Sequence, residues 1–207
     1  AANLCAGGTV SFDAALDNQT ITLTSGQIEL TKTVTIDGPG AAKLAVSGGG
    51  ASRIFTVGTG IPVTIDGLTL RNGYTNAYDG GGAIYAAGPL TVTGSSFVSN
   101  TVASAGDSDR GGGAVSFAGA DQYTLVLSDT TFLSNTAYYA GGALYVANAA
   151  LNLDKSTLSG NTAAGFGELG GAVYCADCDF TIDGATFAGN QAKRGGGLYL
   201  AATNWHM

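Results

Sequence analysis

Two short stretches, Gly81-Gly82-Ala83-Ile84-Tyr85 and Phe97-Val98-Ser99-Asn100, decide the fold, because the chain repeats this pair. Double glycines that open a copy begin at residues 81, 112, 141, 170 and 196. The second stretch recurs as Phe132-Leu133-Ser134-Asn135, Leu158-Ser159-Gly160-Asn161 and Phe187-Ala188-Gly189-Asn190. Self-similarity at a period of about 30 residues is typical of a solenoid, a propeller or another repeat array.

The segments between the two motifs identify the kind of array. They alternate apolar and polar residues over a few positions: Leu90-Thr91-Val92, Leu125-Val126-Leu127, Leu151-Asn152-Leu153 and Phe180-Thr181-Ile182. No segment has a 3.6-residue period, which argues against leucine-rich and helical repeats, and a propeller blade needs four strands in a longer repeat. We therefore predict an all-β fold, a single-stranded right-handed parallel β-helix of about seven turns, with turns about 4.8 Å apart.

The repeat also sets the expected domain boundaries. Residues 1–20 do not show it, and we expect an N-terminal cap there that uses Leu4, Val10, Phe12 and Leu16. Residues 21–200 form the predicted β-helix with repeats of about 29 residues, and residues 201–207 are a C-terminal tail or the start of a further turn. The missing second half of that turn leaves its end open unless Trp205 covers it.

Alternation along each strand sorts the side chains into inward and outward columns. One inward stack is Ile84, Val115, Leu144, Val173 and Leu198, and a second is Leu70, Phe97, Phe132, Leu158 and Phe187. The outward residues beside the first stack are Tyr85, Ser116, Tyr145, Tyr174 and Tyr199. At the corner after the second stack we expect a structural ladder of Asn100, Asn135, Asn161 and Asn190, where amide stacking and left-handed backbone favour Asn.

Aromatic residues concentrate in the segments that join the Asn corner to the next double glycine. These segments, interpreted as loops along one edge, are residues 73–79, 101–110, 136–140, 162–169 and 191–194. Their aromatic residues, Tyr74, Tyr78, Tyr138, Tyr139 and Phe166, are the first candidates for ligand binding. The outward residues Tyr85, Tyr145, Tyr174 and Tyr199 are further candidates, with the alternative that they only hold neighbouring strands together.

Composition excludes several classes of partner. Lys and Arg total 8 against 15 Asp and Glu, for a net charge of −7, so no basic stripe is available for nucleic acid or an anionic membrane surface. No apolar run approaches the length of a membrane-spanning helix, so we expect no direct membrane insertion. The sequence begins at Ala1 without Met, and we interpret it as mature or excised material.

Candidate metal ligands and cysteines are few. Cys5, Cys175 and Cys178 are too few for a disulfide framework, and His206 is the single histidine. We expect Cys175 to be a small buried apolar residue, and a bridge to Cys178 across the next corner remains open. No cofactor is expected.

Stacked carboxylates are the remaining candidates for Ca²⁺ or for catalysis. Asp37 and Asp66 lie one turn apart, as do Asp154 and Asp183, and these four are weak Ca²⁺ candidates. Thr93 and Ser128 occupy the same position in the intervening turns, so the acidic column is broken. Three of the four are followed by Gly, as in ordinary turns, and we expect no metal and no catalytic residues.

The paired motif resembles the repeat of the chlamydial polymorphic membrane proteins and related bacterial surface β-helices. Gly81–Ile84, Gly112–Val115, Gly141–Leu144 and Gly170–Val173 match its first half, and the Phe-x-x-Asn copies match its second. The repeated phrase Val-Thr-Ile-Asp-Gly at residues 34–38 and 63–67 looks like the opening turns of secreted bacterial right-handed β-helix proteins. The resemblance implies an autotransporter-passenger-like protein at the cell surface, often adhesive, although the barrel of that family is absent here.

The leading hypothesis is a non-catalytic adhesin or binding module, located outside the cell or on a bacterial surface. Its partner would be a protein or glycan of a host or neighbouring cell, contacted by the aromatic loops. One alternative is a structural stalk or filament subunit that associates end to end, because such a contact does not close. A second alternative is a β-helix that cleaves polysaccharides, which would need clustered carboxylates on one face.

Overall fold

The computed structural model describes residues 7–103, 111–119, 122–165 and 168–201. Their strands form three seven-stranded parallel sheets, labelled A, B and C, and one short sheet, D. Sheet A contains β1 (Gly8–Ser11), β4 (Val34–Asp37), β7 (Val63–Asp66), β11 (Leu90–Thr93), β15 (Thr124–Ser128), β19 (Ala150–Asp154) and β23 (Asp179–Asp183). Sheet B contains β2 (Gln19–Thr22), β5 (Leu44–Ser47), β8 (Thr69–Arg71), β12 (Ser96–Val98), β16 (Thr131–Leu133), β20 (Thr157–Ser159) and β24 (Thr186–Ala188).

Sheet C contains β3 (Ile28–Leu30), β6 (Phe55–Val57), β10 (Ile84–Ala86), β14 (Val115–Phe117), β18 (Leu144–Ala147), β22 (Val173–Ala176) and β25 (Leu198–Ala201). Sheet D contains β9 (Tyr74–Thr75), β13 (Thr101–Val102), β17 (Thr136–Ala137) and β21 (Thr162–Ala163). The chain visits A, B and C in that order in every turn, and in the third to sixth turns it passes through D between B and C.

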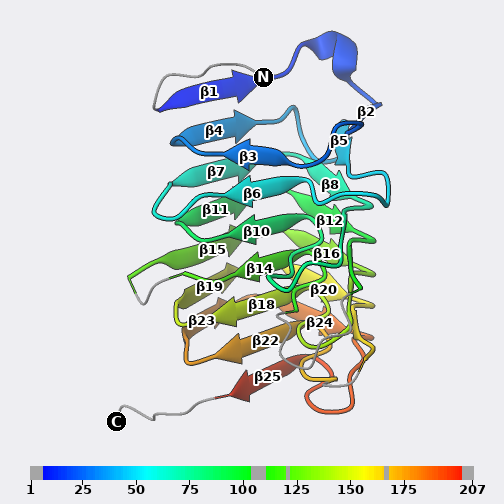
Figure 1. The fold of residues 1–207 in the computed structure, drawn as a ribbon, viewed down its shortest axis with the longest axis vertical. Helices are drawn as coiled ribbons and strands as arrows, with labels where there is room; N and C mark the ends of the chain where they lie inside the picture. The colour runs from blue at the N-terminus through cyan, green and yellow to red at the C-terminus, as the bar shows by residue number, and fades with distance from the viewer. Residues whose placement is uncertain (1–6, 104–110, 120–121, 166–167, 202–207) are drawn as a thin grey trace.

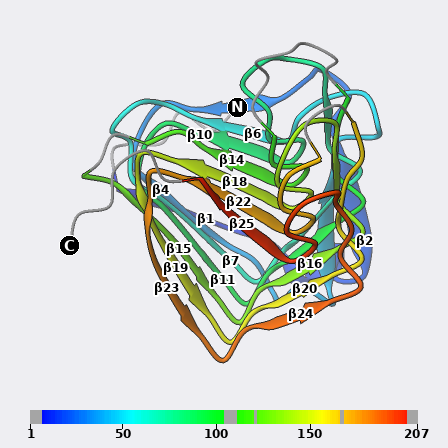
Figure 2. The ribbon, with the colours of Figure 1, turned by 90° about the horizontal axis from the view of Figure 1, so that it is seen from below.

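This order winds the chain into a parallel β-solenoid of seven turns, stacked along one axis in Figure 1. Viewed along that axis, the three long sheets form the sides of the cross-section (Figure 2). The predicted all-β solenoid is confirmed. Within the described ranges the helical element is one short 3₁₀ turn, η1 (Ala14–Leu16), and none of their helices is long and apolar enough to cross a bilayer.

The predicted inward columns are confirmed by the strand register. Ile84 pairs with Val115, Val115 with Leu144 and Leu144 with Val173. Phe97 and Phe132 are fully buried and stack with their ring centroids 4.8 Å apart. Because each inward residue packs on the same position of the next turn, one apolar core runs along the axis of the solenoid.

The first turn begins earlier than the repeat pattern indicates. Strand β1 pairs with β4 in register, Val10 beside Ile36, so the stacking of sheet A extends into the segment expected to form a cap. Phe12 and Leu16 pack against the apolar core as partly buried residues. This segment therefore supplies strands to the solenoid as well as covering its core, and Leu4 lies outside the described residues.

The double glycine has two separate structural causes. The first glycine of each pair, such as Gly81 or Gly112, has a positive φ of 73° or 76°, a region that side chains disfavour. The second glycine has no room for a Cβ, because a Cβ on Gly82 would overlap the carbonyl oxygen of Gly113 in the next turn. Neighbouring turns approach this closely because the backbone N–H of Gly82 donates to that carbonyl at 3.1 Å.

The predicted asparagine ladder is present at the corner after sheet B. The Nδ2 of Asn135 donates to Oδ1 of Asn161 at 2.9 Å and to the carbonyl of Phe97 at 3.1 Å. Its Oδ1 accepts from the backbone N–H of Asn100 at 3.0 Å. One detail of the prediction is wrong: the left-handed residue is the one before the asparagine, for example Ser134 with φ 54°.

The segments interpreted as loops are partly strands. Residues 74–75, 101–102, 136–137 and 162–163 pair in register as sheet D, and Thr75, Val102, Ala137 and Ala163 are buried. The short two-residue strands carry no alternation long enough to be recognised in the sequence. The described residues between these strands and the next double glycine are turns, bends and isolated bridges, such as that of Ala140 with Leu169.

The last described turn has two inward side chains that are partly exposed. The side chains of Phe180 and Leu200 occupy inward columns but are 45% and 43% exposed. Trp205, considered as a lid for this end, lies outside the described residues.

Candidate functional site

The outward tyrosines of sheet C form a stacked column. Tyr145 and Tyr174 stack at 5.1 Å between ring centroids, and Tyr174 and Tyr199 at 5.8 Å, with interplanar angles of 15° and 4°. The rings therefore cover one another's faces, because in-register parallel pairing places them one above the other. We call Tyr85, Tyr145, Tyr174 and Tyr199 the tyrosine column.

Burial raises the pKa of Tyr174 from 10.0 to about 12, and the neighbouring Tyr145, Tyr139, Tyr199 and Asp177 add to this effect. Tyr174 is at the centre of the stacked rings, so its phenolate would lose hydration and face other groups that carry negative charge at high pH. The phenol of Tyr174 is thus a neutral hydrogen-bonding group at physiological pH.

The column is interrupted between Tyr85 and Tyr145 by Ser116, which pairs with both. Ser116 is fully buried although it points outward, and its hydroxyl has no hydrogen-bond partner. The gap left by the small Ser side chain separates Tyr85 from the three stacked rings.

Tyr85 instead packs against Arg53, whose guanidinium carbon lies 5.5 Å from the ring centroid. Arg53 is buried and pairs with Asp79, and it donates to the carbonyls of Gly81 at 2.9 Å and Gly80 at 2.8 Å. No motif in the sequence indicates a role for Arg53. It precedes Ile54 and occupies the position of the second glycine in later turns. Its bonds join sheet C to the segment that contains Tyr78.

The five aromatic residues predicted in loops occupy different surroundings. Tyr78 is 72% exposed, the largest value among the exposed large apolar side chains of the described residues. Tyr138 and Tyr139 are half-buried, and Tyr139 is close enough to Tyr174 to influence its pKa. Phe166 lies outside the described residues. The structure therefore brings Tyr139 to the tyrosine column and leaves Tyr78 projecting into solvent.

Tyr74 begins β9 and lines an open groove of about 270 Å³ at the corner between sheets B and D. The other lining residues are Gly49, Gly50, Asn72, Gly73, Ser99 and Thr101. Amide, hydroxyl and phenol groups are thus available beside one aromatic ring, a combination suited to hydrogen-bonding ligands such as sugars. Tyr78 follows four residues later in the same irregular segment.

The aspartates stack as the repeat predicts. Asp37 pairs with Asp66 and Asp154 with Asp183, and Thr93 and Ser128 stand between the two pairs in register. Thr93 donates to Asp66 at 2.5 Å and Ser128 to Asp154 at 3.0 Å, so hydroxyls of neighbouring turns satisfy these carboxylates. In the part of the chain that the structure describes, His, Cys, Asp and Glu do not gather in any group of three that could hold a metal ion.

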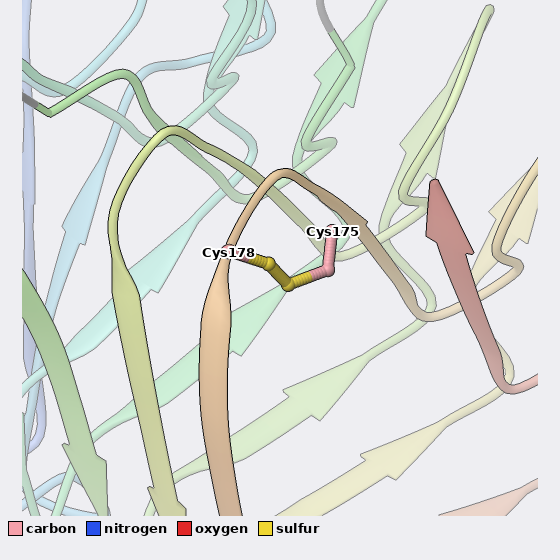
Figure 3. The surroundings of a disulfide bond; sticks show 2 residues. All are labelled: Cys175 and Cys178. Carbon is pink, nitrogen blue, oxygen red and sulfur yellow. A yellow bond between two sulfur atoms is a disulfide. The ribbon is translucent and has the colours of Figure 1, made fainter. Parts of the chain in front are cut away.

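Cys175 and Cys178 form a disulfide across the corner between β22 and β23, with Cα atoms 5.9 Å apart (Figure 3). Cys175 is buried in an inward column beside Val146, as expected of a small apolar residue. Asp177 between them has a positive φ of 48°, so the bridge closes a tight turn. The disulfide lies where the chain passes from the sixth turn to the seventh.

The comparison with protein families matches part of one turn of this solenoid. Residues 129–147 match the Chlamydia polymorphic membrane protein repeat. The matched range runs from the corner before β16 to the end of β18 and includes Phe132, Asn135 and the double glycine at residues 141–142. No curated protein and no solved structure matches the chain significantly.

Proposed function

We propose that this protein is a non-catalytic binding module of the extracellular or bacterial cell surface, an adhesin that contacts a glycan or protein of another cell. The contact surface is the corner between sheets B and C, where Tyr74 and Tyr78 lie. The observation that carries the proposal is the exposure of Tyr78, 72%, four residues after the ring that lines the groove at Tyr74.

Exposed tyrosines suit such a role for physical reasons. A tyrosine buries a large rigid area on binding, retains a polar tip, and is frequent among the residues that dominate binding energy. Single exposed apolar residues are common on monomeric surfaces, but Tyr78 stands four residues after Tyr74, which lines a polar groove. The tyrosine column has a different role in this proposal: its rings stack face to face, so it mainly stabilises sheet C and offers only ring edges and hydroxyls.

The surface location is supported by the match of residues 129–147 to a repeat described for Chlamydia polymorphic membrane proteins. A disulfide between Cys175 and Cys178 agrees with it, because disulfides persist in oxidising compartments outside the cytosol. We propose the absence of catalysis because Asp66 and Asp154 accept hydrogen bonds from hydroxyls of neighbouring turns, and neither described groove is lined by a carboxylate.

The experiment is binding of the parent and the Tyr74→Ser/Tyr78→Ser variant to a glycan array and to intact cells. We expect the double variant to lose about tenfold or more in affinity, because buried tyrosines at the centre of an interface contribute most of its energy. Tyr145→Ser is the comparison for the column, and it should lower thermal stability while leaving affinity unchanged. Parent-like binding of the double variant would contradict the proposal.

End-to-end self-association is a second candidate, favoured by one observation. Phe180 and Leu200 of the last described turn are inward residues with nearly half of their surface exposed, and they lie in strands β23 and β25, at the ends of their sheets. Unpaired strand edges are sites where another chain can add. Sedimentation at rising concentration tests this: the parent should associate, Leu200→Glu should remain monomeric, and a monomeric parent would rule the candidate out.

A further inference from the structure

A second groove lies on the outer face of sheet B, in the first turns of the solenoid, and shares no lining residue with the groove at Tyr74. It has a volume of about 320 Å³. Its lining residues come from β2, β5, β8 and the segment before β5: Asn18, Gln19, Thr20, Ala41, Ala42, Lys43, Leu44, Ala45, Thr69 and Arg71. The sequence gives no sign of this groove, because Arg71 belongs to Leu70-Arg71-Asn72, a degenerate copy of the Phe-x-x-Asn motif.

Arg71 is the unusual residue of this groove. Its Nη2 donates to the hydroxyl of Thr20 at 2.8 Å, while its Nε is buried and has no hydrogen-bond partner. Its neighbours in register, Ser47 and Val98, carry no charge. By contrast, the basic side chains that form the described ion pairs, Lys43, Arg53 and Lys155, each contact an aspartate.

Arg71 lines the groove, and its buried Nε without an acceptor leaves the hydrogen bonds of the guanidinium incomplete, which is costly. The charge of the groove indicates the charge of the ligand it would bind. Lys43 is neutralised by Asp17 at 3.3 Å, and Arg71 therefore leaves a local positive charge on a chain whose net charge is −7. A guanidinium presents its N–H groups as a planar fork that fits an oxyanion with two oxygens, such as a carboxylate.

The remaining lining favours a saccharide as the carrier of that oxyanion. The Thr20 hydroxyl accepts from Arg71 and can donate to a ligand, whereas the Thr69 hydroxyl donates to the carbonyl of Ala41 at 2.7 Å and can accept from one. The amides of Asn18 and Gln19 add further hydrogen-bonding groups, and Ala45 forms an apolar floor. We propose that this groove binds an acidic saccharide, with Arg71 holding its carboxylate. This site is separate from the corner of Tyr74 and Tyr78, so it adds a second ligand class rather than depending on the adhesive contact.

The test uses nuclear magnetic resonance titration of the intact chain with galacturonic acid, galactose and N-acetylaspartyl amide. Galacturonic acid should shift the amide resonances of Ala42, Thr69 and Arg71, and galactose should bind about tenfold more weakly or less, because it lacks the charge-assisted hydrogen bonds. Raising the salt concentration should weaken binding of the acid alone.

Variants test whether binding depends on Arg71 itself or on the net charge of the protein. Arg71→Gln should lower affinity for galacturonic acid about tenfold, and Arg71→Lys should give an intermediate value because it keeps the charge but loses the fork. Arg194→Gln, an exposed arginine in the last described turn, makes the same change of charge and should bind like the parent. Thermal melts check that each variant is folded.

Three results would overturn the proposal. They are equal affinity for galactose and galacturonic acid, unchanged affinity in a folded Arg71→Gln variant, and equal or tighter binding of N-acetylaspartyl amide, which would identify a peptide carboxylate instead. Loss of galacturonic acid binding with intact adhesion in Arg71→Gln, and the reverse in Tyr74→Ser/Tyr78→Ser, would show that the two sites are independent.

Discussion

At the scale of a residue, Asn135 shows how one side chain can complete the hydrogen bonds of three turns. It donates to Phe97 and Asn161 and accepts from Asn100, and it is fully buried. Side chains of any other type would leave some of these groups unpaired. The asparagine of the repeat is therefore a structural requirement at this corner.

We predict that Asn135→Ala destabilises the protein by about 3 kcal/mol. Each buried polar group left without a partner costs about 1–3 kcal/mol, and the substitution affects the N–H of Asn100 and the carbonyl of Phe97. Urea unfolding measures this. Asn152→Ala, on the exposed outer side of β19, is the control and should change stability by less than about 0.5 kcal/mol. Equal effects of the two substitutions would contradict the ladder.

The stability should also fall at high pH because of Tyr174. Its pKa is about 12 in the folded protein and 10.0 without the surroundings. Below pH 10 the phenol is neutral in both states, whereas between pH 10 and about 12 the unfolded chain loses the proton first, so unfolding becomes more favourable as pH rises. Melting temperature against pH, with Tyr174→Phe as control, measures this. The variant should lose less stability over that range, and identical curves would contradict the assignment.

At the scale of an element, the same residue type contributes differently to stability at different positions of a strand ladder. Phe132 in β16 is fully buried and stacked on Phe97, whereas Phe180 in β23 occupies an inward column but is 45% exposed. Both belong to repeated strands, and their difference follows from whether another turn lies on each side of the ring.

We therefore predict a cost of about 3–5 kcal/mol for Phe132→Ala, since a buried aromatic leaves both lost transfer energy and a cavity. Phe180→Ala is the matched control and should cost clearly less, because part of its ring already contacts water. Chemical unfolding of both variants compares them. A cost for Phe180→Ala equal to that of Phe132→Ala would show that the last turn is covered.

At the scale of the whole molecule, stability should vary along the axis. Each turn contacts only its neighbours, so a turn packed on one side has about half of the stabilising contacts of a central turn. The disulfide between Cys175 and Cys178 connects the last two turns and should limit their opening.

Hydrogen exchange should show this gradient directly. We expect the amides of β24 and β25 to exchange faster than those of β11 and β12, because local opening requires fewer contacts to break at an end. Reduction of the disulfide should speed exchange near the corner of β22 and β23 and leave the central turns unchanged. Uniform exchange along the solenoid would contradict a nearest-neighbour architecture.

The repeat determined the architecture because stacking converts a periodic sequence into columns. Ile84, Phe97 and Asn100 recur at one position per turn, and parallel pairing in register leaves each of them facing its own copy. The double glycine reflects the same stacking, since only glycine allows the backbones of adjacent turns to approach at that corner. Such features are local and periodic, so the sequence alone contains them.

Other features depend on contacts between residues that no period connects. The strands of sheet D are too short to recognise in the sequence. Arg53 lies against Tyr85 and Asp79 of the next turn. The guanidinium of Arg71 reaches Thr20, two strands away in sheet B. Exposure is also a tertiary property: Tyr78 and Tyr139 look alike in the sequence, yet one projects into solvent and the other adjoins Tyr174. The sequence by itself determined the columns, whereas the tertiary structure decided which side chains remain available for a ligand, because availability depends on what the neighbouring turns cover.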